Sequence, residues 1–336
     1  MRVGIIGAGF MGTTHAAAWA ETAATLVGVA DSDADAAAGL ATRYHARGYP
    51  SLQAILAEVD VVDICTPTHL HYEMVLAAAA AGRQVICEKP LARTVAQGQA
   101  MIAACRQAGV RLLIAHVVRF FPEYALARSL VVAGQIGRPA VLRLARGGHR
   151  PQKAVGNWFL DVEKSGGLLL DLMIHDFDYA RWVAGEVETV FARSIGHSRP
   201  GAPVDYGLAI LRHRGGALSH VAAAWAYPPP TFRTGLEIAG DGGLIEFESA
   251  AMAPIELLLR PDGAGSTPDV GKPSSPVHES PYTTEIKEFY AALAHGHPVR
   301  VTAEDGLAAL QIALAAAESA HTGQAVRLAP LPEVQP

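Results

Sequence analysis

In the first third of the chain, short runs of β-branched and aliphatic residues alternate with longer Ala-rich stretches. A run such as Val59–Cys65 is apolar at most positions, which is typical of a strand covered on both faces of a parallel sheet. The Ala-rich stretches have the composition of helices, and Gly82 and Gly109 stand where helix C-caps are expected. This alternation predicts βαβ units and an α/β, doubly wound parallel sheet. The expected strands are Arg2–Ile6, Thr25–Ala30, Val59–Cys65, Gln84–Cys87 and Arg111–Ala115.

Beyond about Arg119 the pattern changes. Pro122–Val132 has the composition of a helix, and longer strand-like runs follow it. The segments RHRGGAL and AGDGGLIEF are typical of hairpin turns between neighbouring strands. Because no helix is expected within these hairpins, the pattern predicts an α+β domain with a large, mostly antiparallel open sheet and helices on one side. The expected strands are Ala140–Ala145, Val187–Ser194, Tyr206–Arg212, Ala217–Trp225, Thr234–Ala239, Leu244–Glu248 and Ile255–Leu259.

The last part of the chain begins with a segment rich in Pro, Gly and Ser, Asp262–Pro281, which predicts a long surface loop. Two helices, Thr284–Ala294 and Ala303–His321, are expected after it. A length of 336 residues suits two domains rather than one. We place the first over residues 1–118 and the second over residues 119–330.

Composition and charge exclude several classes of protein. Half of the residues are hydrophobic and 18% are charged, so a large core is expected. The formal net charge of −5 is spread without blocks, which argues against a partner such as nucleic acid or an anionic membrane. No secretory signal and no apolar run of membrane-spanning length is visible, which indicates a soluble, cytoplasmic protein. The cysteines are three in number and lack a paired motif, so we expect reduced thiols at Cys65, Cys87 and Cys105.

A glycine motif follows the first expected strand and opens the first expected helix. It reads Gly7-Ala8-Gly9-Phe10-Met11-Gly12, a GxGxxG in the strand–helix context that a dinucleotide-binding Rossmann domain requires. Gly7 permits the tight turn, Gly9 lets the backbone approach a pyrophosphate, and Gly12 lets the helix pack closely on the strand. The free N–H groups at the start of the helix favour phosphate binding. We therefore expect the first domain to bind a nicotinamide dinucleotide.

Asp31 ends the second expected strand, 19 residues beyond Gly12. An acid at this place is expected to hold the adenosine ribose hydroxyls, and its charge repels a 2′-phosphate. NAD is therefore favoured over NADP as cofactor. The alternative role of Asp31 is the N-cap of the next helix, which Ser32 or Asp33 could supply equally well.

Two further strand ends should face the same crevice, because ligands in such sheets bind outside the carboxyl ends of the strands. His69 and His71 in this region form an H-x-H pair that could suggest a metal, but no third ligand accompanies them. A helix start with cofactor packing at His71 is the simpler interpretation, and we expect no metal. The residues expected to line the cofactor at these strand ends are Thr66, Pro67, His71, Glu88, Lys89 and Pro90.

Taken in order along the chain, these motifs resemble the Gfo/Idh/MocA oxidoreductases, a family that includes glucose–fructose oxidoreductase and inositol dehydrogenase. The resemblance covers nearly the whole chain and rests on GIIGAGFMG, CTPTHLHYE, EKPLA, RFFPEY, SGGLLLDLMIHDFD and EIKEFYAAL. It implies a Rossmann domain, a C-terminal α+β domain with a large open sheet, and nicotinamide-dependent oxidation or reduction of a polyol, sugar or related hydroxyl. It also implies a homodimer or homotetramer formed through that sheet. Lys89, Asp171 and His175 match the family's motif lysine, aspartate and histidine.

The chain departs from the family pattern at three positions. Ser165 stands where the family often has a glycine, and Thr68 where it often has Asn. Met173 stands where a smaller residue is frequent, and we expect it to shape the substrate pocket. These departures concern the choice of substrate more than the chemistry.

The segment Gly166–Ala180, GGLLLDLMIHDFDYA, reads as one buried helix that carries Asp171 and His175 four residues apart, hence on one face. Transfer of a hydride from a secondary alcohol requires a base for the hydroxyl proton, and histidine titrates near neutrality. We assign His175 as the general acid/base. Lys89 is expected to donate a hydrogen bond to the reacting oxygen and to stabilise its developing negative charge, and Asp171 to orient His175 or bind a neighbouring hydroxyl. Which of Lys89 and His175 takes the proton stays open, since a coupled pair can share it. A hydrogen-bonded core histidine is the alternative role of His175.

The segment between the expected strand Ala140–Ala145 and the expected helix Gly166–Ala180 supplies the candidates for substrate binding. It reads LARGGHRPQKAVGNWF, and a solvated loop is the alternative interpretation. Its side chains that could reach the cleft are Arg146, His149, Arg150, Asn157 and Trp158, beside Lys89, Asp171 and His175.

The leading functional hypothesis is an NAD(P)-dependent dehydrogenase that acts on a CH–OH group of a cyclic polyol, sugar or sugar derivative. An NAD-dependent glycoside hydrolase of the same architecture is one alternative. A non-catalytic regulator that binds NAD(H) is another, although a sensor has no need of the base at His175.

Overall fold

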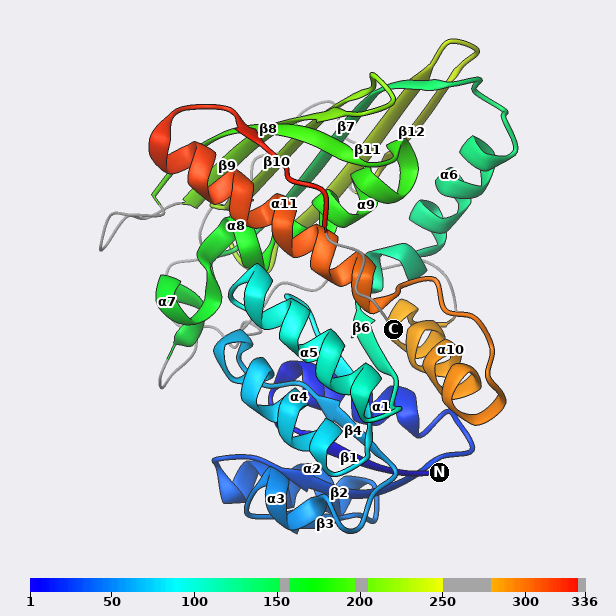
Figure 1. Cartoon of the computed structure of the whole chain (residues 1–336), viewed down its shortest axis with the longest axis vertical. Coiled ribbons are helices and arrows are strands. Elements are labelled where there is room, and N and C mark those ends of the chain that lie inside the picture. The colour runs from blue at the N-terminus through cyan, green and yellow to red at the C-terminus, as the bar shows by residue number, and fades with distance from the viewer. Residues whose placement is uncertain (152–156, 197–204, 250–278, 332–336) are drawn as a thin grey trace. The chain divides into compact units, whose positions relative to one another are not determined.

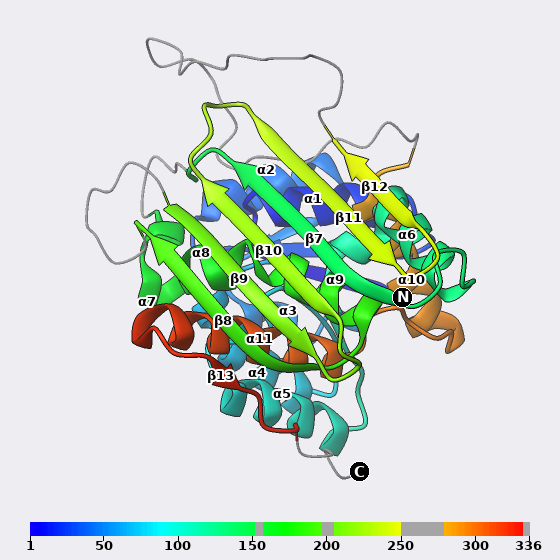
Figure 2. The same ribbon diagram turned by 90° about the horizontal axis from the view of Figure 1, so that it is seen from above.

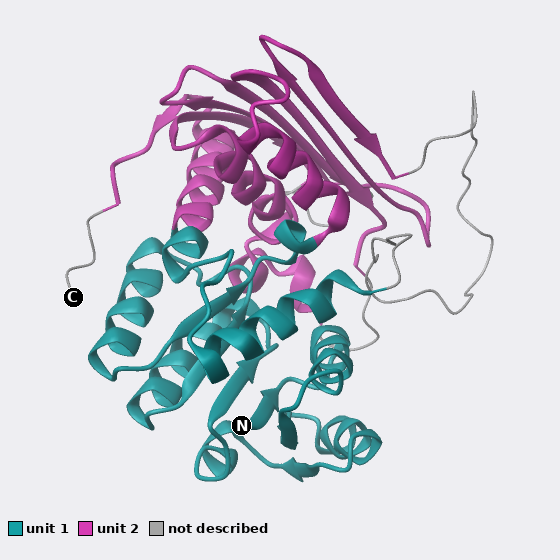
Figure 3. Cartoon of the chain, turned by 90° about the vertical axis from the view of Figure 1, so that its right-hand side faces the viewer, with its two compact units in different colours: residues 1–120, 277–307, 332–336 teal, residues 121–276, 308–331 magenta. Residues whose placement is uncertain are grey.

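The computed structural model describes residues 1–151, 157–196, 205–249 and 279–331 (Figure 1). The chain divides into two compact units, coloured separately in Figure 3. Unit 1 holds the described residues of 1–120 and 277–307, and unit 2 those of 121–276 and 308–331. The expected strand Ile255–Leu259 and most of the expected loop Asp262–Pro281 lie outside the described residues.

Unit 1 is built on a six-stranded parallel sheet in the order β3-β2-β1-β4-β5-β6. This is the strand order of a doubly wound dinucleotide-binding sheet, so the predicted fold class is confirmed. Strands β4 and β6 are buried along their whole length because helices cover the faces of the sheet, as the near-continuous apolar runs predict. The strands are β1 (Arg2–Ile6), β2 (Thr25–Ala30), β3 (Arg47–Tyr49), β4 (Val61–Ile64), β5 (Gln84–Glu88) and β6 (Leu112–Ala115).

The connections of unit 1 begin and end where the sequence signals place them. Thr94 caps α5 through its hydroxyl, and Gly82 and Gly109 end their helices at φ +68° each, as expected of C-cap glycines. The three-residue strand β3 was missed because RGY has no alternating pattern to mark it. The helices are α1 (Phe10–Trp19), α2 (Ala34–Arg43), α3 (Leu52–Ile55), η1 (Thr68–Leu70), α4 (His71–Ala80), α5 (Val95–Gln107) and η2 (Val117–Phe120).

The closing part of the chain returns to unit 1. Helix α10 (Pro281–His295) packs on α1, and the first turn of α11 (Ala303–Thr322) also belongs to this unit. Buried Arg119 joins it to the Rossmann sheet, since its guanidinium donates to the Arg300 carbonyl at 2.6 Å and to Asp305 at 3.1 Å. The core of unit 1 is therefore completed by residues almost 200 positions downstream.

Unit 2 is built on a seven-stranded sheet in the order β12-β11-β7-β10-β9-β8-β13. The two hairpins β9–β10 and β11–β12 are antiparallel, as their turn sequences predict. The pair β7–β10 is parallel, so the sheet is mostly rather than wholly antiparallel. Its strands are β7 (Pro139–Gly148), β8 (Val187–Ile195), β9 (Asp205–His213), β10 (Leu218–Trp225), β11 (Phe232–Gly240), β12 (Leu244–Glu248) and β13 (Val326–Arg327).

The helices of unit 2 gather on one face of this sheet, as Figure 2 shows for α8, α9 and α11. Buried and exposed positions alternate along β9, which is the pattern of a sheet with one covered face. No helix within the described residues is long and apolar enough to cross a membrane. The helices of this unit, apart from α11, are α6 (Pro122–Val132), η3 (Trp158–Leu160), α7 (Val162–Ser165), α8 (Gly167–Asp171) and α9 (Ile174–Ala184).

Candidate functional site

The glycine loop of unit 1 has the geometry of a phosphate cradle. Gly7 adopts φ +105°, and a Cβ there would lie 2.6 Å from the Cys65 carbonyl. A Cβ on Gly12 would lie 1.8 Å from the Gly7 carbonyl, so only glycine permits the close packing of helix and strand. Gly9 is exposed, and a Cβ built on it meets no described atom within 4 Å. The loop is thus closed by two glycines and leaves open space beside the third, at the start of α1, where the N–H groups of a helix favour an anion.

Asp31 ends β2 beside this loop. Its carboxylate accepts the Ala8 N–H at 2.6 Å and the Asp33 N–H at 2.9 Å. The N-cap of α2 is Asp33, which accepts from Asp35 and Ala36, so the capping role left open for Asp31 belongs to its neighbour. A carboxylate accepts about four hydrogen bonds, so these contacts are compatible with a ribose hydroxyl as a further donor. Phe10 and Met11, also expected at the cofactor, are half-buried on the first turn of α1.

The carboxyl ends of β4 and β5 are joined by His71. Its Nε2 lies 2.9 Å from the Thr66 carbonyl and its Nδ1 lies 2.9 Å from the Pro90 carbonyl. The ring is fully buried, and burial lowers the pKa of His71 although the two carbonyls oppose this shift. With both ring nitrogens against backbone, His71 braces the two segments expected to face the cofactor. The H-x-H pair is therefore not arranged as a metal site.

Lys89 follows β5 and is half-buried. Its backbone N–H donates to Oε2 of Glu88 at 3.0 Å. The Glu88 side chain is itself buried, with 7% of its surface exposed, and its Oε1 lies 3.3 Å from Nε2 of His15. Glu88 therefore faces into unit 1, while the main chain at Lys89 and Pro90 continues the strand-end edge.

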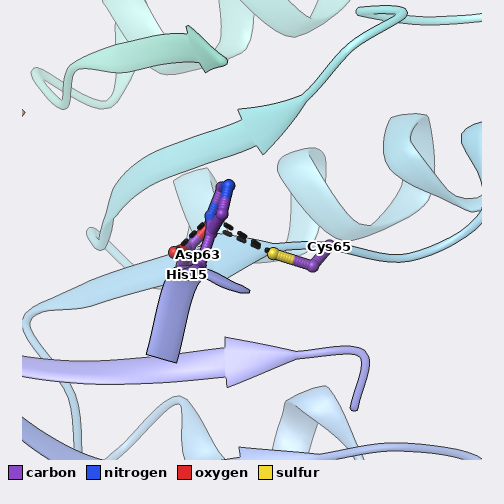
Figure 4. A group of neighbouring side chains, drawn as sticks. All are labelled: His15, Asp63 and Cys65. Carbon is purple, nitrogen blue, oxygen red and sulfur yellow. Dashed lines mark hydrogen bonds and ion pairs between the residues drawn. The ribbon is translucent and has the colours of Figure 1, made fainter. Parts of the chain in front are cut away.

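A buried group that the sequence reasoning missed lies under this edge. Nδ1 of His15 lies 3.0 Å and 3.1 Å from the two carboxylate oxygens of Asp63 and 3.4 Å from Sγ of Cys65 (Figure 4). Trp19 Nε1 donates to the same Asp63 at 2.8 Å. Burial lowers the pKa of His15, but the charge of Asp63, the neighbouring Cys65 and the hydrogen bonds to both together outweigh burial and hold that pKa well above its usual value.

Three of these side chains, His15, Asp63 and Cys65, bring possible metal-ligand atoms within 4.8 Å of one another. Burial and the charge of Asp63 raise the pKa of Cys65, so the thiol keeps its proton, whereas a metal requires the thiolate. Atoms around tetrahedral zinc are separated by about 3.3–3.7 Å, given bonds of about 2.0–2.3 Å. The His15–Asp63 distances are those of a hydrogen bond instead. We interpret the group as a charge-assisted hydrogen-bond cluster.

In unit 2, Ser165, Gly166 and Gly167 form the turn that introduces the aspartate and histidine of the motif. Gly166 and Gly167 adopt φ +83° and +66°, a left-handed pair that favours glycine. The Ser165 hydroxyl donates to the Phe159 carbonyl at 2.8 Å and accepts the Gly167 N–H at 2.8 Å. Ser165, which replaces a frequent glycine, therefore stabilises the turn.

The expectation of one continuous helix over Gly166–Ala180 is wrong. The chain forms α8 and α9 with a break at Leu172 and Met173, where the N–H groups of both residues donate to the Leu168 carbonyl at 3.0 Å. This widened turn interrupts the regular hydrogen bonding of the helix. Asp171 ends α8 and is buried, and His175 stands in the first turn of α9 and is half-buried. The two residues therefore belong to different helices, and the i,i+4 argument does not describe their relation.

The other carboxylates of this segment are part of the core. Asp176 accepts two hydrogen bonds of 2.9 Å from the Arg146 guanidinium, and both side chains are almost completely buried. Arg146, considered as a substrate residue, instead forms this bidentate pair between β7 and α9. Asp178 is also fully buried.

Met173 does not shape a pocket. It is fully buried, and its sulfur lies beside Gly207 of β9, where a Cβ would approach it to 2.6 Å. Glycine on β9 therefore makes room for the larger side chain, and Met173 fills the core of unit 2. Leu168, Leu169 and Phe177 are buried with it, as the sequence predicts.

The remaining substrate candidates lie near the end of β7. His149 is buried, with 4% of its surface exposed. Arg150 lies 3.9 Å from Asp205, and Asn157 donates to the Pro151 carbonyl at 2.8 Å. Trp158 stacks on Phe159 at a centroid distance of 4.1 Å. Asn157 and Trp158 belong to the segment that leads into α7, next to the turn that carries Ser165.

Comparison with known proteins finds the same family in both units. The family model of the Gfo/Idh/MocA oxidoreductases with an NAD-binding Rossmann fold matches residues 1–116, and the model of the C-terminal domain of the same family matches residues 124–246. The chain is 32% identical to 1,5-anhydro-D-fructose reductase of Ensifer adhaerens, over 81% of this chain and 80% of that protein. It is 30% identical to myo-inositol 2-dehydrogenase of Thermotoga maritima, over 98% of each. Among solved structures, levoglucosan dehydrogenase in complex with NADH and levoglucosan has a TM-score of 0.83 and 26% identity, over 98% of this chain and all of that one.

Proposed function

The chain belongs to the Gfo/Idh/MocA family of NAD-binding oxidoreductases, and we propose that it is a dehydrogenase of a cyclic polyol or sugar. The glycine loop carries the first part of this proposal, because Gly9 leaves open space at the start of α1 beside Asp31. Relatives that cover nearly the whole chain are named for inositol and levoglucosan, which are both polyhydroxylated rings. The substrate we propose for this chain is therefore a secondary hydroxyl, or the corresponding ketone, on such a ring.

The bound nicotinamide would accept or supply the hydride, and the protein has to manage the proton of the hydroxyl. We assign His175 the role of general acid/base, since an imidazole exchanges a proton near neutral pH. Lys89 donates a hydrogen bond to the reacting oxygen and stabilises the negative charge that develops on it. Asp171 orients His175 or binds a neighbouring hydroxyl. Support for these assignments comes from the match of all three residues to the motif positions of the family.

The substrate-binding role extends to the end of β7. His149, Asn157 and Trp158 are the side chains proposed there. Asn157 is held by its hydrogen bond to the Pro151 carbonyl, and Trp158 by its stack on Phe159. An aromatic face, an amide and an imidazole are groups that suit a ring with both C–H and hydroxyl faces.

Asp31 is proposed to select NAD over NADP. Its carboxylate lies against the glycine loop through the Ala8 N–H, where the ribose is expected. A 2′-phosphate would meet this negative charge directly.

The open face of the unit 2 sheet is proposed as the contact surface between copies of the chain. Alternating positions of β8, β9 and β10 expose large apolar side chains, which a monomer seldom gathers on one face. Substituting Ile195→Asp should shift a dimer or tetramer toward monomer in light scattering after gel filtration, and an unchanged mass would contradict this surface. The exposed side chains are Phe191, Ile195, Tyr206 and Leu218.

A substrate panel tests the proposed function. Inositols, aldoses, anhydrosugars and sugar acids are each incubated with NAD or NADP, and absorbance of the reduced cofactor is followed. We expect turnover of at least one ring polyol with NAD preferred. A substrate that is hydrolysed without one NADH per product would favour the glycosidase alternative, and binding of NADH with no turnover of any compound would favour a regulator.

A further inference from the structure

The buried cluster at His15 connects two strand ends of unit 1. His15 stands on α1, Asp63 on β4 and Glu88 on β5, so one imidazole bridges carboxylates from two neighbouring strands. Nδ1 is hydrogen-bonded to Asp63 at 3.0 Å, and Nε2 lies 3.3 Å from Oε1 of Glu88 in an ion-pair contact that lacks hydrogen-bond geometry. His15 and Asp63 have no exposed side-chain surface, and Glu88 retains 7%.

The far end of this bridge reaches the main chain of Lys89. Glu88 contacts His15 with Oε1 and accepts the Lys89 N–H at 3.0 Å with Oε2. The orientation of the Glu88 carboxylate therefore links the buried imidazole to the backbone that carries the Lys89 side chain. If Glu88 rotates, the Lys89 N–H loses its acceptor.

Electrostatics requires a cation at the centre of this group. Two carboxylates buried on adjacent strands repel each other unless a positive charge stands between them. Helix α10 adds Glu285, which is fully buried and whose carboxyl oxygens have no hydrogen-bond partner in the described part of the chain. Burial, together with Glu88 and Asp63 and against the charge of His15, raises the pKa of Glu285 well above its usual value, so this acid stays neutral. The imidazolium of His15, which contacts both Asp63 and Glu88, thus offsets part of their negative charge.

We propose that His15 is a positioning residue that acts through Glu88 to fix the backbone at Lys89 and thereby the direction of the Lys89 ammonium group. The inference rests on the proposed catalytic role of Lys89. A displacement of a catalytic group by about 1 Å can lower turnover by about a hundredfold, so a bridge of this kind influences the rate without touching the substrate.

Two amide substitutions separate the two contacts of the imidazole. In His15→Asn the amide nitrogen takes the place of Nδ1, which keeps a donor for Asp63 and removes the one that faces Glu88. In His15→Gln the amide nitrogen takes the place of Nε2, which keeps the donor for Glu88. Both variants lose the charge. His15→Asn also loses the ion-pair contact with Glu88, whereas His15→Gln loses the hydrogen bond to Asp63, so a merely structural role predicts the larger effect in His15→Gln. Trp19→Phe is the matched control, because it removes a buried hydrogen bond to Asp63 and leaves both His15 contacts in place.

The first readout needs no substrate. Hydrogen exchange of the Lys89 amide, followed by mass spectrometry of peptides that cover Cys87–Leu91, reports its bond to Glu88 directly. We expect exchange about tenfold faster in His15→Asn, corresponding to the loss of about one hydrogen bond, and nearly unchanged in His15→Gln and Trp19→Phe. Equal exchange in His15→Asn and wild type would overturn the proposal.

The second readout is the steady-state rate with myo-inositol and NAD, or with the best substrate of the panel. We expect kcat to fall roughly tenfold or more in His15→Asn while KM for NAD stays within about threefold, and His15→Gln to retain a kcat several-fold higher than His15→Asn. A loss in His15→Gln equal to or larger than that in His15→Asn, or an equal loss in Trp19→Phe, would reduce His15 to a core residue. The variant Lys89→Ala separates the catalytic role of Lys89 from the positioning role of His15. If it keeps the wild-type kcat, the role of Lys89 is wrong, and if it loses activity while His15→Asn does not, only the positioning role is wrong.

Discussion

The open space beside Gly9 allows a sharp prediction about the cofactor site. Gly9 has φ −75° and ψ −159°, a conformation open to any residue, and a Cβ there meets no described atom. Gly9→Ala should therefore destabilise the fold by less than about 1 kcal/mol, the cost of alanine at an N-cap. A phosphate in contact with the Gly9 Cα lies about 3.5–4 Å away, and the added methyl carbon stands about 1.5 Å nearer to it. The overlap should weaken NADH binding by at least about tenfold, or about 1.4 kcal/mol.

Gly12→Ala is the matched control within the same loop. Its Cβ would lie 1.8 Å from the Gly7 carbonyl, so the loop has to move by more than about 1 Å to restore normal contact. We expect this variant to lose about 1–3 kcal/mol of stability, with a Tm lower by several degrees. NADH affinity is measured by fluorescence titration and Tm by circular dichroism for both variants. Wild-type affinity in Gly9→Ala would refute the assignment of the loop to the phosphates, and a wild-type Tm in Gly12→Ala would refute the packing argument.

Three further predictions concern buried and charged side chains. Arg146→Met leaves Asp176 buried and unpaired and should cost about 3–5 kcal/mol in chemical denaturation, whereas the double variant with Asp176→Leu should recover most of this loss; no recovery would contradict the pairing. Because burial raises the pKa of Glu285 in the folded state, its contribution to stability is complete below pH of about 4.3 and is lost as pH rises through the raised pKa, at up to about 1.4 kcal/mol per pH unit. Glu285→Gln should flatten this decline between pH 5 and 8.5 in denaturant titrations, and an unchanged slope would show that Glu285 is not the group responsible. Asp31→Ala should lower the ratio of kcat/KM for NAD over NADP by roughly tenfold, since a charged hydrogen bond contributes about 1.5–3 kcal/mol, and an equal ratio in variant and wild type would remove Asp31 from cofactor selection.

Local sequence signals were sufficient for most of the fold. Gly7, Gly9 and Gly12 stand in a strand–turn–helix context that only a narrow set of backbone geometries satisfies, and the structure has this geometry. Hairpin signals placed two strand pairs of the unit 2 sheet in the same way. The parallel β7–β10 pair could not be predicted, because it joins residues about 75 positions apart with no local pattern to specify their register.

The candidate site was harder to predict where side chains act on distant partners. The sequence did not predict the break between α8 and α9 at Met173. Leu172 and Met173 keep helical dihedral angles there, and the break lies only in the hydrogen-bond pattern. His15 is one polar residue on an apolar helix, and its partners Asp63 and Glu88 follow it by 48 and 73 positions. A histidine on a buried helix face three positions after the motif glycine was the available signal, and alone it cannot name those partners.

The central claim is hydride transfer between the carbon of a ring CH–OH group and the nicotinamide, with His175 as acid/base for the hydroxyl proton. It is tested most directly with myo-inositol deuterated at its ring carbons, or the equivalent label in the best substrate of the panel. We predict one reduced cofactor per ketone formed, deuterium at C4 of the nicotinamide ring, and a kcat about 10²–10⁴ lower in His175→Ala with NADH affinity unchanged. Product formed without accumulation of deuterated cofactor, or wild-type turnover in His175→Ala, would contradict the mechanism.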